Sequence, residues 1–232
     1  MIKALRKSVV LIIALLTIFN PAKIPVSYAM PVTGMVEKAY KVNHIINPTS
    51  SIFLNDYVET DSESRALKAL NEFVSSVADG QSEVIRGLFV DEKTAFQVIQ
   101  QPAGQTAFVS SVDDVITEFA MARSRGVVGM LAHNYLAGKY FSEIQMDEII
   151  QVVYGDGQVK MYQVVDIQRY QALQPNSPHS EFLDLDTSQR LTATQLFNKV
   201  YTGDHHVTLQ TCIQVGEVDT WGRLFIIAEP IS

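Results

Sequence analysis

Short runs of apolar residues, several with alternating polar positions, cover most of the chain, which is the pattern of strands more than of helices. Seven runs are predicted to be strands: residues 84–90, 95–100, 127–133, 147–154, 158–168, 207–213 and 223–228. Asp91-Glu92-Lys93 joins the first two, and Gly155-Asp156-Gly157 joins the fourth and fifth, so both pairs are predicted hairpins. Many short strands with few helices favour a closed or nearly closed β-barrel.

Three segments instead show the spacing of helices. Residues 60–79 place apolar side chains on one face. A second helix is predicted along 112–120, because Ser111 begins a sequence that resembles a capping box. A third, short helix over 193–201 is predicted to be capped by Thr192. The expected fold is therefore mostly β, with two or three short helices beside the barrel.

The N-terminus has the layout of a signal peptide. Lys3, Arg6 and Lys7 precede an apolar run over 9–19, which is shorter than the ~20 residues that cross a bilayer. Small residues lead up to the bond after Ala29, where we predict cleavage; the alternatives are an uncleaved anchor and a buried cytosolic helix. Both a cleaved signal and an anchor place the working part outside the cytoplasm, secreted or at the cell surface.

The chain is therefore predicted to have three parts. Residues 1–29 are the signal peptide, and 30–80 are an N-terminal linker and helix. Residues 81–232 form the barrel domain, and within it the polar stretch 171–190 is predicted to be a long loop. No internal repeat is present.

Composition and charge limit the classes of function that the chain can have. Of 232 residues, 47% are hydrophobic and 19% charged, as in globular proteins. The formal charge is −7, and removal of the first 29 residues, with four bases and no acid, takes it to −11. Binding to nucleic acid requires a positive surface that displaces counterions from phosphates, so this class is disfavoured.

The chain has one cysteine, Cys212, at the end of a predicted strand. Exported domains usually pair their cysteines, so an unpaired thiol outside the cytoplasm is either buried or used. If the last two strands form a hairpin, Arg223 comes close to Cys212 at the mouth of the barrel, and His133 ends another strand. A nucleophilic thiol needs a proton acceptor and a cation for the oxyanion. An inert buried cysteine, a strand-end histidine and a surface arginine fit the same positions.

The segment Thr208-Leu209-Gln210-Thr211-Cys212 resembles the Thr-Leu-x-Thr-Cys signature of sortases, the bacterial cysteine transpeptidases. Arg223 downstream and His133 upstream, within Ala132-His133-Asn134, complete the triad of that family in the same chain order. The similarity covers roughly residues 84–231. It implies a closed eight-stranded barrel, with Cys212 as nucleophile, His133 as general acid and base, and Arg223 stabilising the substrate and the oxyanion.

The resemblance also implies the reaction and its partners. Cys212 would attack a sorting-motif peptide of an exported protein and hold it as a thioester, which an amine of the cell wall or of a protein then releases. No cofactor and no metal take part. We expect a bell-shaped pH profile centred between pH 7 and 8. The short, apparently cleavable N-terminal run differs from the full membrane helix of many sortases.

Other interpretations remain at this point. A thiol peptidase would use water as acceptor, and a non-catalytic secreted β-barrel binding module would keep an inert cysteine. Asp204-His205-His206 suggests a metal, although adjacent strand residues point to opposite faces and rarely share an ion. Glu181, Asp184 and Asp186 offer oxygen ligands for calcium, although acidic loops are usually only solvated.

Overall fold

The computed structural model describes residues 61–90 and 94–231. The predicted signal peptide (1–29) and residues 30–60 lie outside the described residues, so export and the division at residue 80 stay predictions. The described helices are α2 (Asp61–Val77), α3 (Ala120–Arg123), α4 (Ala193–Tyr201) and the 3-10 helix η2 (Ala137–Glu143). Of these helices, none has the length and apolar character needed to cross a bilayer.

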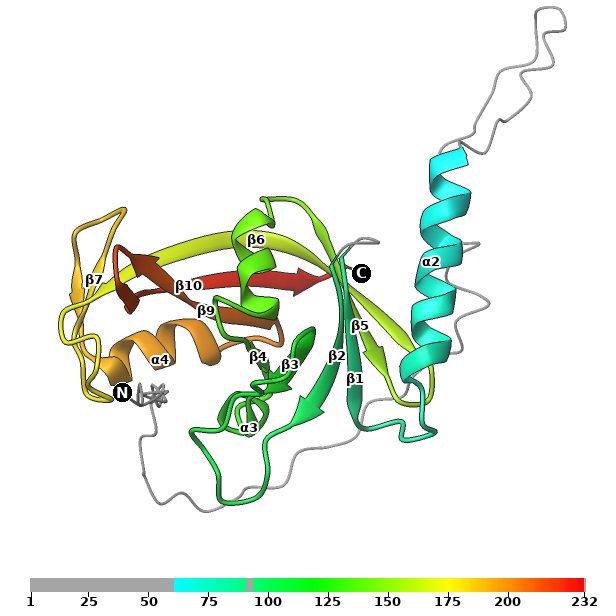
Figure 1. Ribbon diagram of the computed structural model, residues 1–232, viewed down its shortest axis with the longest axis horizontal. Coiled ribbons are helices and arrows are strands. Elements are labelled where there is room, and N and C mark those ends of the chain that lie inside the picture. The colour runs from blue at the N-terminus through cyan, green and yellow to red at the C-terminus, as the bar shows by residue number, and fades with distance from the viewer. Residues whose placement is uncertain (1–60, 91–93, 232) are drawn as a thin grey trace, which may run out of the picture.

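Eight strands close into a barrel, which confirms the predicted fold class (Figure 1). They are β1 (Ile85–Phe89), β2 (Ala95–Gln100), β3 (Val115–Glu118), β4 (Val128–Leu131), β5 (Ile149–Tyr154), β6 (Val159–Ala172), β9 (Val207–Val215) and β10 (Val218–Pro230). Their order is β10-β9-β4-β3-β2-β1-β5-β6, and pairing of β6 with β10 completes the ring. β7 (Phe182–Asp184) and β8 (Arg190–Leu191) extend the sheet beyond β6.

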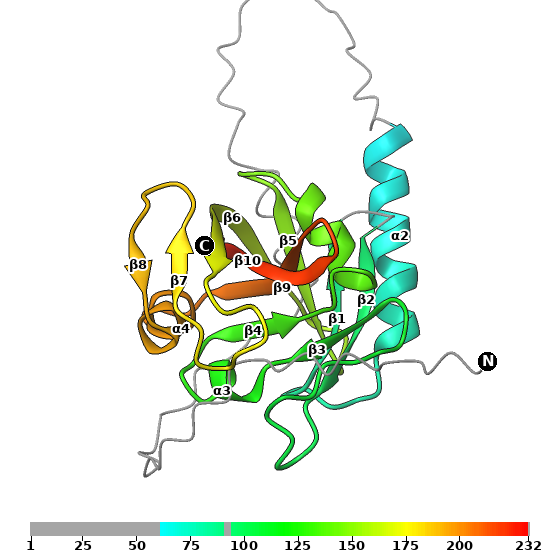
Figure 2. The ribbon, with the colours of Figure 1, turned by 60° about the vertical axis from the view of Figure 1, so that its left-hand side comes forward.

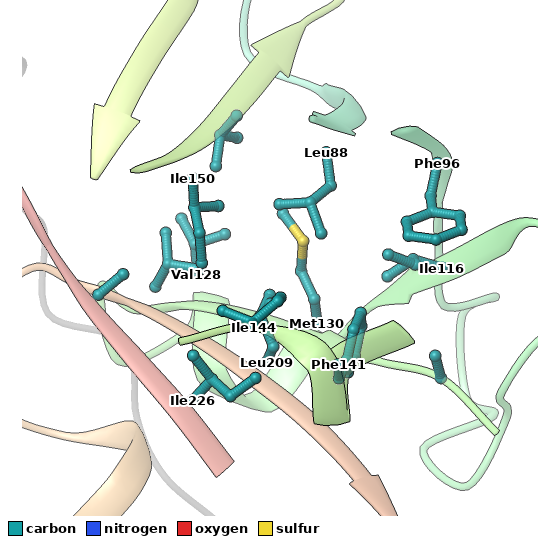
Figure 3. Close-up of a cluster of buried hydrophobic side chains, with 14 of the residues drawn as sticks. Leu88, Phe96, Ile116, Val128, Met130, Phe141, Ile144, Ile150, Leu209 and Ile226 are labelled. Atoms are coloured by element: carbon teal, nitrogen blue, oxygen red, sulfur yellow. The ribbon is translucent and has the colours of Figure 1, made fainter. Parts of the chain in front are cut away.

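The inside of the barrel is filled by one cluster of apolar side chains, to which each of the eight strands contributes (Figure 3). Leu88, Met130 and Leu209 are fully buried there, and each such side chain contributes about 1.5–3 kcal/mol to folding. Successive side chains of a strand point to opposite faces. Because Leu209 points inward, Gln210 and Cys212 point outward.

A second apolar cluster lies on the outside of the barrel, between the sheet and α4. The predicted cap of α4 is confirmed, because the side chains of Thr192 and Gln195 each accept the backbone N–H of the other. The Thr208 hydroxyl donates to a backbone carbonyl of α4 (2.6 Å), and the Tyr201 hydroxyl donates to the side chain of Gln210 (2.7 Å). These two bonds hold α4 against the outer face of β9.

The predicted helix over residues 60–79 is confirmed as α2. The ring of Phe73 lies over β1 at Gly87, where an added Cβ would come within 2.6 Å of the ring. Just beyond the helix, Asp79 pairs with Arg86 at 2.7 Å. In both ribbon views α2 lies on the side of the barrel away from α4, β7 and β8 (Figures 1 and 2).

The predicted helix over residues 112–120 is wrong. Val115–Glu118 forms β3, which pairs in parallel with β2, and α3 begins only at Ala120. Three β-branched residues favour a strand here, and Ile116 fills the barrel interior. Pairing with a distant strand therefore outweighs the local capping signal.

The predicted loop over residues 171–190 is wrong in part, because it contains β7 and β8. The Asp184 carboxylate accepts hydrogen bonds from the backbone N–H groups of Asp186 and Thr187, each at 3.0 Å, and from the Lys199 ammonium at 3.4 Å. Burial by itself would raise the pKa of Asp184, but these donors bring it below its ordinary value. This carboxylate stabilises the turn between β7 and β8.

Candidate active site

Cys212 and Arg223 face each other across two neighbouring strands. β9 and β10 pair as an antiparallel hairpin, and the register places Arg223 directly opposite Cys212. Side chains of directly opposite residues point to the same face, with Cβ atoms about 4.5–5.5 Å apart. Both side chains therefore project from the outer face of the barrel wall.

His133 comes from the strand on the other side of β9. β4 runs parallel to β9 with Leu131 level with Gln210, and the Ala132 N–H donates to the Gln210 carbonyl (3.2 Å). β4 ends at Leu131, and Ala132 and His133 follow it directly. Cys212 and Arg223 therefore lie on paired strands, and His133 follows the end of the strand on the other side of β9. That the three groups meet at one site stays a prediction.

The layer that α4 forms over the outer face of β9 ends at Cys212. The side chains of Thr208 and Gln210 are buried and bonded to α4, Cys212 is half-buried, and Gln214 is exposed. The thiol therefore lies at the edge of the apolar layer, where a substrate can reach it.

Arg223 is a buried cation, only 4% exposed. Its Nη1 donates to the carbonyls of Thr220 (3.0 Å) and Gly222 (2.8 Å), and its guanidinium carbon lies 6.0 Å from the centre of the Phe182 ring. No carboxylate within 61–90 or 94–231 forms an ion pair with it. In these segments no fully buried side-chain nitrogen or oxygen lacks a partner, so the remaining guanidinium N–H groups still reach solvent.

The solved structures to which this chain is similar are sortases. Sortase A of Corynebacterium diphtheriae is 12% identical, over 75% of this chain and 70% of that chain, with a TM-score of 0.43. Listeria monocytogenes sortase A is 13% identical, over 64% and 88%, with a TM-score of 0.40. Streptomyces coelicolor sortase E1, which has a tripeptide in its active site, is 16% identical, over 67% and 91%, with a TM-score of 0.39. No protein-family model and no curated protein matches the sequence.

Burial moves the two candidate proton-transfer groups in opposite directions. It raises the pKa of the Cys212 thiol; the Arg223 guanidinium opposes this, and the Asp219 carboxylate adds to it. Burial lowers the pKa of the His133 imidazole, while the backbone carbonyl of Val109 partly restores it. Both shifts favour the neutral form of the respective group at neutral pH.

These shifts predict the pH dependence of kcat/KM, which reports the groups of the free enzyme. We expect a bell whose acid limb lies below pH 6.5 and whose alkaline limb lies above pH 9.0, the ordinary values of the two groups. The bell is therefore broader than unperturbed groups would give. Rates with a cleavable peptide from about pH 5 to about pH 11 measure it. Two limbs inside the interval from 6.5 to 9.0 would contradict the burial of this pair.

A hydrogen bond from the Thr211 side chain fixes the backbone next to His133. The Thr211 hydroxyl donates to the Ala132 carbonyl at 3.0 Å, and the next carbonyl, that of His133, accepts the N–H groups of Leu136 and Gly138 at 3.0 Å each. A Cβ on Gly138 would collide with the Thr211 hydroxyl, so this position requires glycine. The sequence indicated only packing for Thr211, because the partner carbonyl is distant along the chain.

Replacing Thr211 by valine should therefore disturb the imidazole as well as the fold. The variant keeps the shape but leaves a buried carbonyl without its donor, which costs about 1–3 kcal/mol of unfolding free energy. Because the same carbonyl precedes His133, we also expect the acid limb of the pH profile to move. Denaturant unfolding and the pH profile measure the two effects. Thr211→Ser keeps the hydroxyl and should restore both; equal behaviour of the valine and serine variants would refute this positioning role.

The structure shows the contacts of three further residues around the site. The Tyr135 ring stacks on the His133 imidazole, with centroids 5.2 Å apart and planes at 17°. Asn134 does not bond the imidazole; its side-chain N–H donates to the Asp219 carbonyl at 3.1 Å. Asp219 lies 85 residues away along the chain, so no sequence motif joins it to the histidine.

The two metal hypotheses find no support in the described ranges, where no cluster of three metal-ligating side chains is present. The ring nitrogens of His205 contact the Tyr162 hydroxyl and the Gly126 carbonyl. Both ring nitrogens of His206 contact backbone carbonyls. In the acidic segment, Glu181 pairs with Arg190 at 3.5 Å. These side chains take part in structural contacts.

Proposed function

We propose that this protein is an exported, sortase-like cysteine transpeptidase. The observation that carries the proposal is the pairing of β9, which places Arg223 opposite Cys212 on one side and has β4, the strand that His133 follows, on the other side. The Thr208–Cys212 signature supports the same assignment from the sequence. The proposal requires that one peptide carbonyl contacts all three groups.

In the first half of the reaction, the Cys212 sulfur attacks a peptide carbonyl carbon. The C–S bond forms as the carbonyl oxygen becomes an oxyanion, and the N–H groups of Arg223 that reach solvent are available to stabilise it. His133 takes the thiol proton and donates it to the leaving amine, so the C–N bond breaks and a thioester remains.

In the second half, an incoming amine replaces the sulfur. Its nitrogen attacks the thioester carbonyl carbon, and His133 accepts a proton from that nitrogen. The new C–N bond forms, the C–S bond breaks, and the proton returns to the sulfur. Water in place of the amine gives hydrolysis with the same groups.

We further propose that the substrates are sorting-motif peptides of exported proteins and that the acceptor is an amine of the cell wall or of a protein. The signal-like segment over residues 1–29 supports a location outside the cytoplasm, secreted or at the cell surface. No cofactor or metal is part of the proposal.

A peptide library tests the proposal. The protein is incubated with the library with and without added amines, and the products are analysed by mass spectrometry. Amine-linked products show transfer, and cleaved peptides alone show a thiol hydrolase. Absence of both, together with a thiol that reacts only after denaturation, would indicate a non-catalytic binding module.

Modification of Cys212 by a neutral thiosulfonate, which forms a mixed disulfide and releases a sulfinate, provides a second readout that needs no peptide. We expect the native protein to be modified without denaturation, at a rate that depends on pH, because His133 accepts the thiol proton as the thiolate forms. His133→Ala should remove this reactivity. His179→Ala is the matched control, because His179 lies outside the three strands of the site.

A further inference from the structure

Hydrogen bonds fix the backbone on both sides of Tyr135. The carbonyl of His133 accepts the N–H groups of Leu136 and Gly138, each at 3.0 Å, and so closes a turn around Tyr135. The side chain of Asn134 donates to a backbone carbonyl of the β9–β10 hairpin at 3.1 Å. The side chain of Tyr135 therefore reaches the imidazole of His133 from a backbone position that is held in place.

The imidazole of His133 has no side chain that orients it through a hydrogen bond, in the part of the chain that the structure describes. The amide of Asn134, the residue next to it, is bonded to the hairpin instead. Burial lowers the pKa of His133, the backbone carbonyl of Val109 opposes this, and no charged side chain of the described residues contributes. A hydrogen bond from one ring nitrogen to a carbonyl leaves the ring free to tilt about that bond, so another contact has to set the tilt.

The ring of Tyr135 makes a contact of this kind. It lies over one face of the His133 imidazole, with centroids 5.2 Å apart and planes at 17°. A hydrogen bond would occupy a ring nitrogen, whereas stacking uses the face and leaves the nitrogens, which lie in the ring plane, available for proton transfer. Tyr135 is 57% exposed, and its hydroxyl has no hydrogen-bond partner among the described residues. The ring is therefore the part of this side chain that acts on the imidazole.

We propose that Tyr135 is a positioning residue, whose ring fixes the plane of the His133 imidazole so that a ring nitrogen can take the Cys212 proton. This inference rests on the proposed function and adds a residue that acts through the imidazole. The lone pair and the N–H of an imidazole lie in its plane, so the orientation of that plane decides which atoms exchange a proton with it. The ring of Tyr135 also keeps water from one face, which contributes to the burial that lowers the pKa of His133.

Nuclear magnetic resonance of the imidazole tests the contact without a substrate. The ring C–H signals of His133 are assigned among the five histidines by comparison with His133→Ala, and they are followed as the pH is varied. Tyr135→Phe keeps the ring, so it should keep the upfield ring-current shift of these signals and the wild-type titration midpoint. Tyr135→Ala should lose the ring-current shift. Its midpoint should move up toward 6.5, because water reaches the uncovered face and stabilises the imidazolium.

Kinetics with a peptide donor from the library separate positioning of the imidazole from binding of the peptide. Tyr135→Ala should lower kcat about threefold to tenfold, as expected for the loss of one aromatic contact, with the KM of the peptide unchanged. Tyr135→Leu keeps an apolar side chain without a flat ring and should show the same loss, whereas Tyr135→Phe should match the wild type. A raised KM at unchanged kcat would mean that the ring contacts the peptide, and would overturn the positioning role.

The matched control is Met146→Ala, which removes another exposed apolar side chain, outside the turn that carries His133. It should leave the His133 signals and kcat at their wild-type values. Because Tyr135 is exposed, its variants should unfold at the wild-type midpoint. Identical His133 signals in Tyr135→Ala and Tyr135→Phe would refute the contact. If the library gives no acyl transfer, the proposed function fails, and the signals and midpoint of His133 still decide whether Tyr135 holds the imidazole.

Discussion

Cys212→Ala is expected to abolish acyl transfer, with a loss of at least about 10⁴-fold in kcat, because the covalent step has no other nucleophile on this face. Cys212 is the only cysteine of the chain, and its outward neighbours on β9 are amide side chains, Gln210 and Gln214. Cys212→Ser should also be strongly impaired, because a hydroxyl ionises far less readily than a thiol at neutral pH. Product formation from a library peptide measures both variants.

A matched control separates chemistry from folding. Cys212 is half-buried at the edge of the apolar layer, so alanine and serine are both accommodated, and we expect unfolding midpoints close to that of the wild type. Gln214→Ala, two residues further along the same face, should keep its activity. Transfer that persists in Cys212→Ala would disprove a thioester mechanism.

Arg223→Met is expected to lower kcat/KM about 10²- to 10³-fold, the usual effect of removing one group that stabilises an oxyanion. Methionine retains an apolar stem against Phe182 and removes the charge. The guanidinium lowers the pKa of the Cys212 thiol, so this pKa should rise in the variant. Peptide kinetics measure the first effect, and alkylation rates against pH measure the second.

Arg223→Lys distinguishes charge from shape. Lysine keeps the positive charge but lacks the planar set of N–H donors, so we expect the thiol pKa to be restored and kcat/KM to recover only in part. Full activity of Arg223→Met, at an unchanged unfolding midpoint, would remove Arg223 from the site. A lowered midpoint would point instead to the bonds that its Nη1 makes with Thr220 and Gly222.

Local patterns predicted correctly those elements whose partners are near in the chain. The hairpin around Gly155-Asp156-Gly157 and the helix capped by Thr192 are both observed, because turn chemistry and capping act over a few residues. The helix predicted over residues 112–120 is wrong for the same reason. Its capping signal is local, whereas the pairing of β3 with β2 is a long-range contact that short-range rules do not contain.

The candidate residues were predicted from the sequence, together with the hairpin that places Arg223 near Cys212. The pairing of β9 with β4, the strand that His133 follows, was not predicted and follows from the tertiary structure. No pattern in the sequence indicated that Tyr135 or Asp219 lies near the site. Their contacts depend on the stacking at His133 and on the closing of the β9–β10 hairpin over the turn at Asn134.

The sequence by itself determined that this is a mostly β protein with one thiol, preceded by a signal-like segment, because alternation, turn residues and composition act locally. Only the tertiary structure decided that β6 closes the barrel onto β10 and that the thiol faces outward, beyond the cover of α4. A shift of one residue in register turns every side chain to the other face. Register depends on packing of the whole barrel, and it therefore decides which groups meet at Cys212.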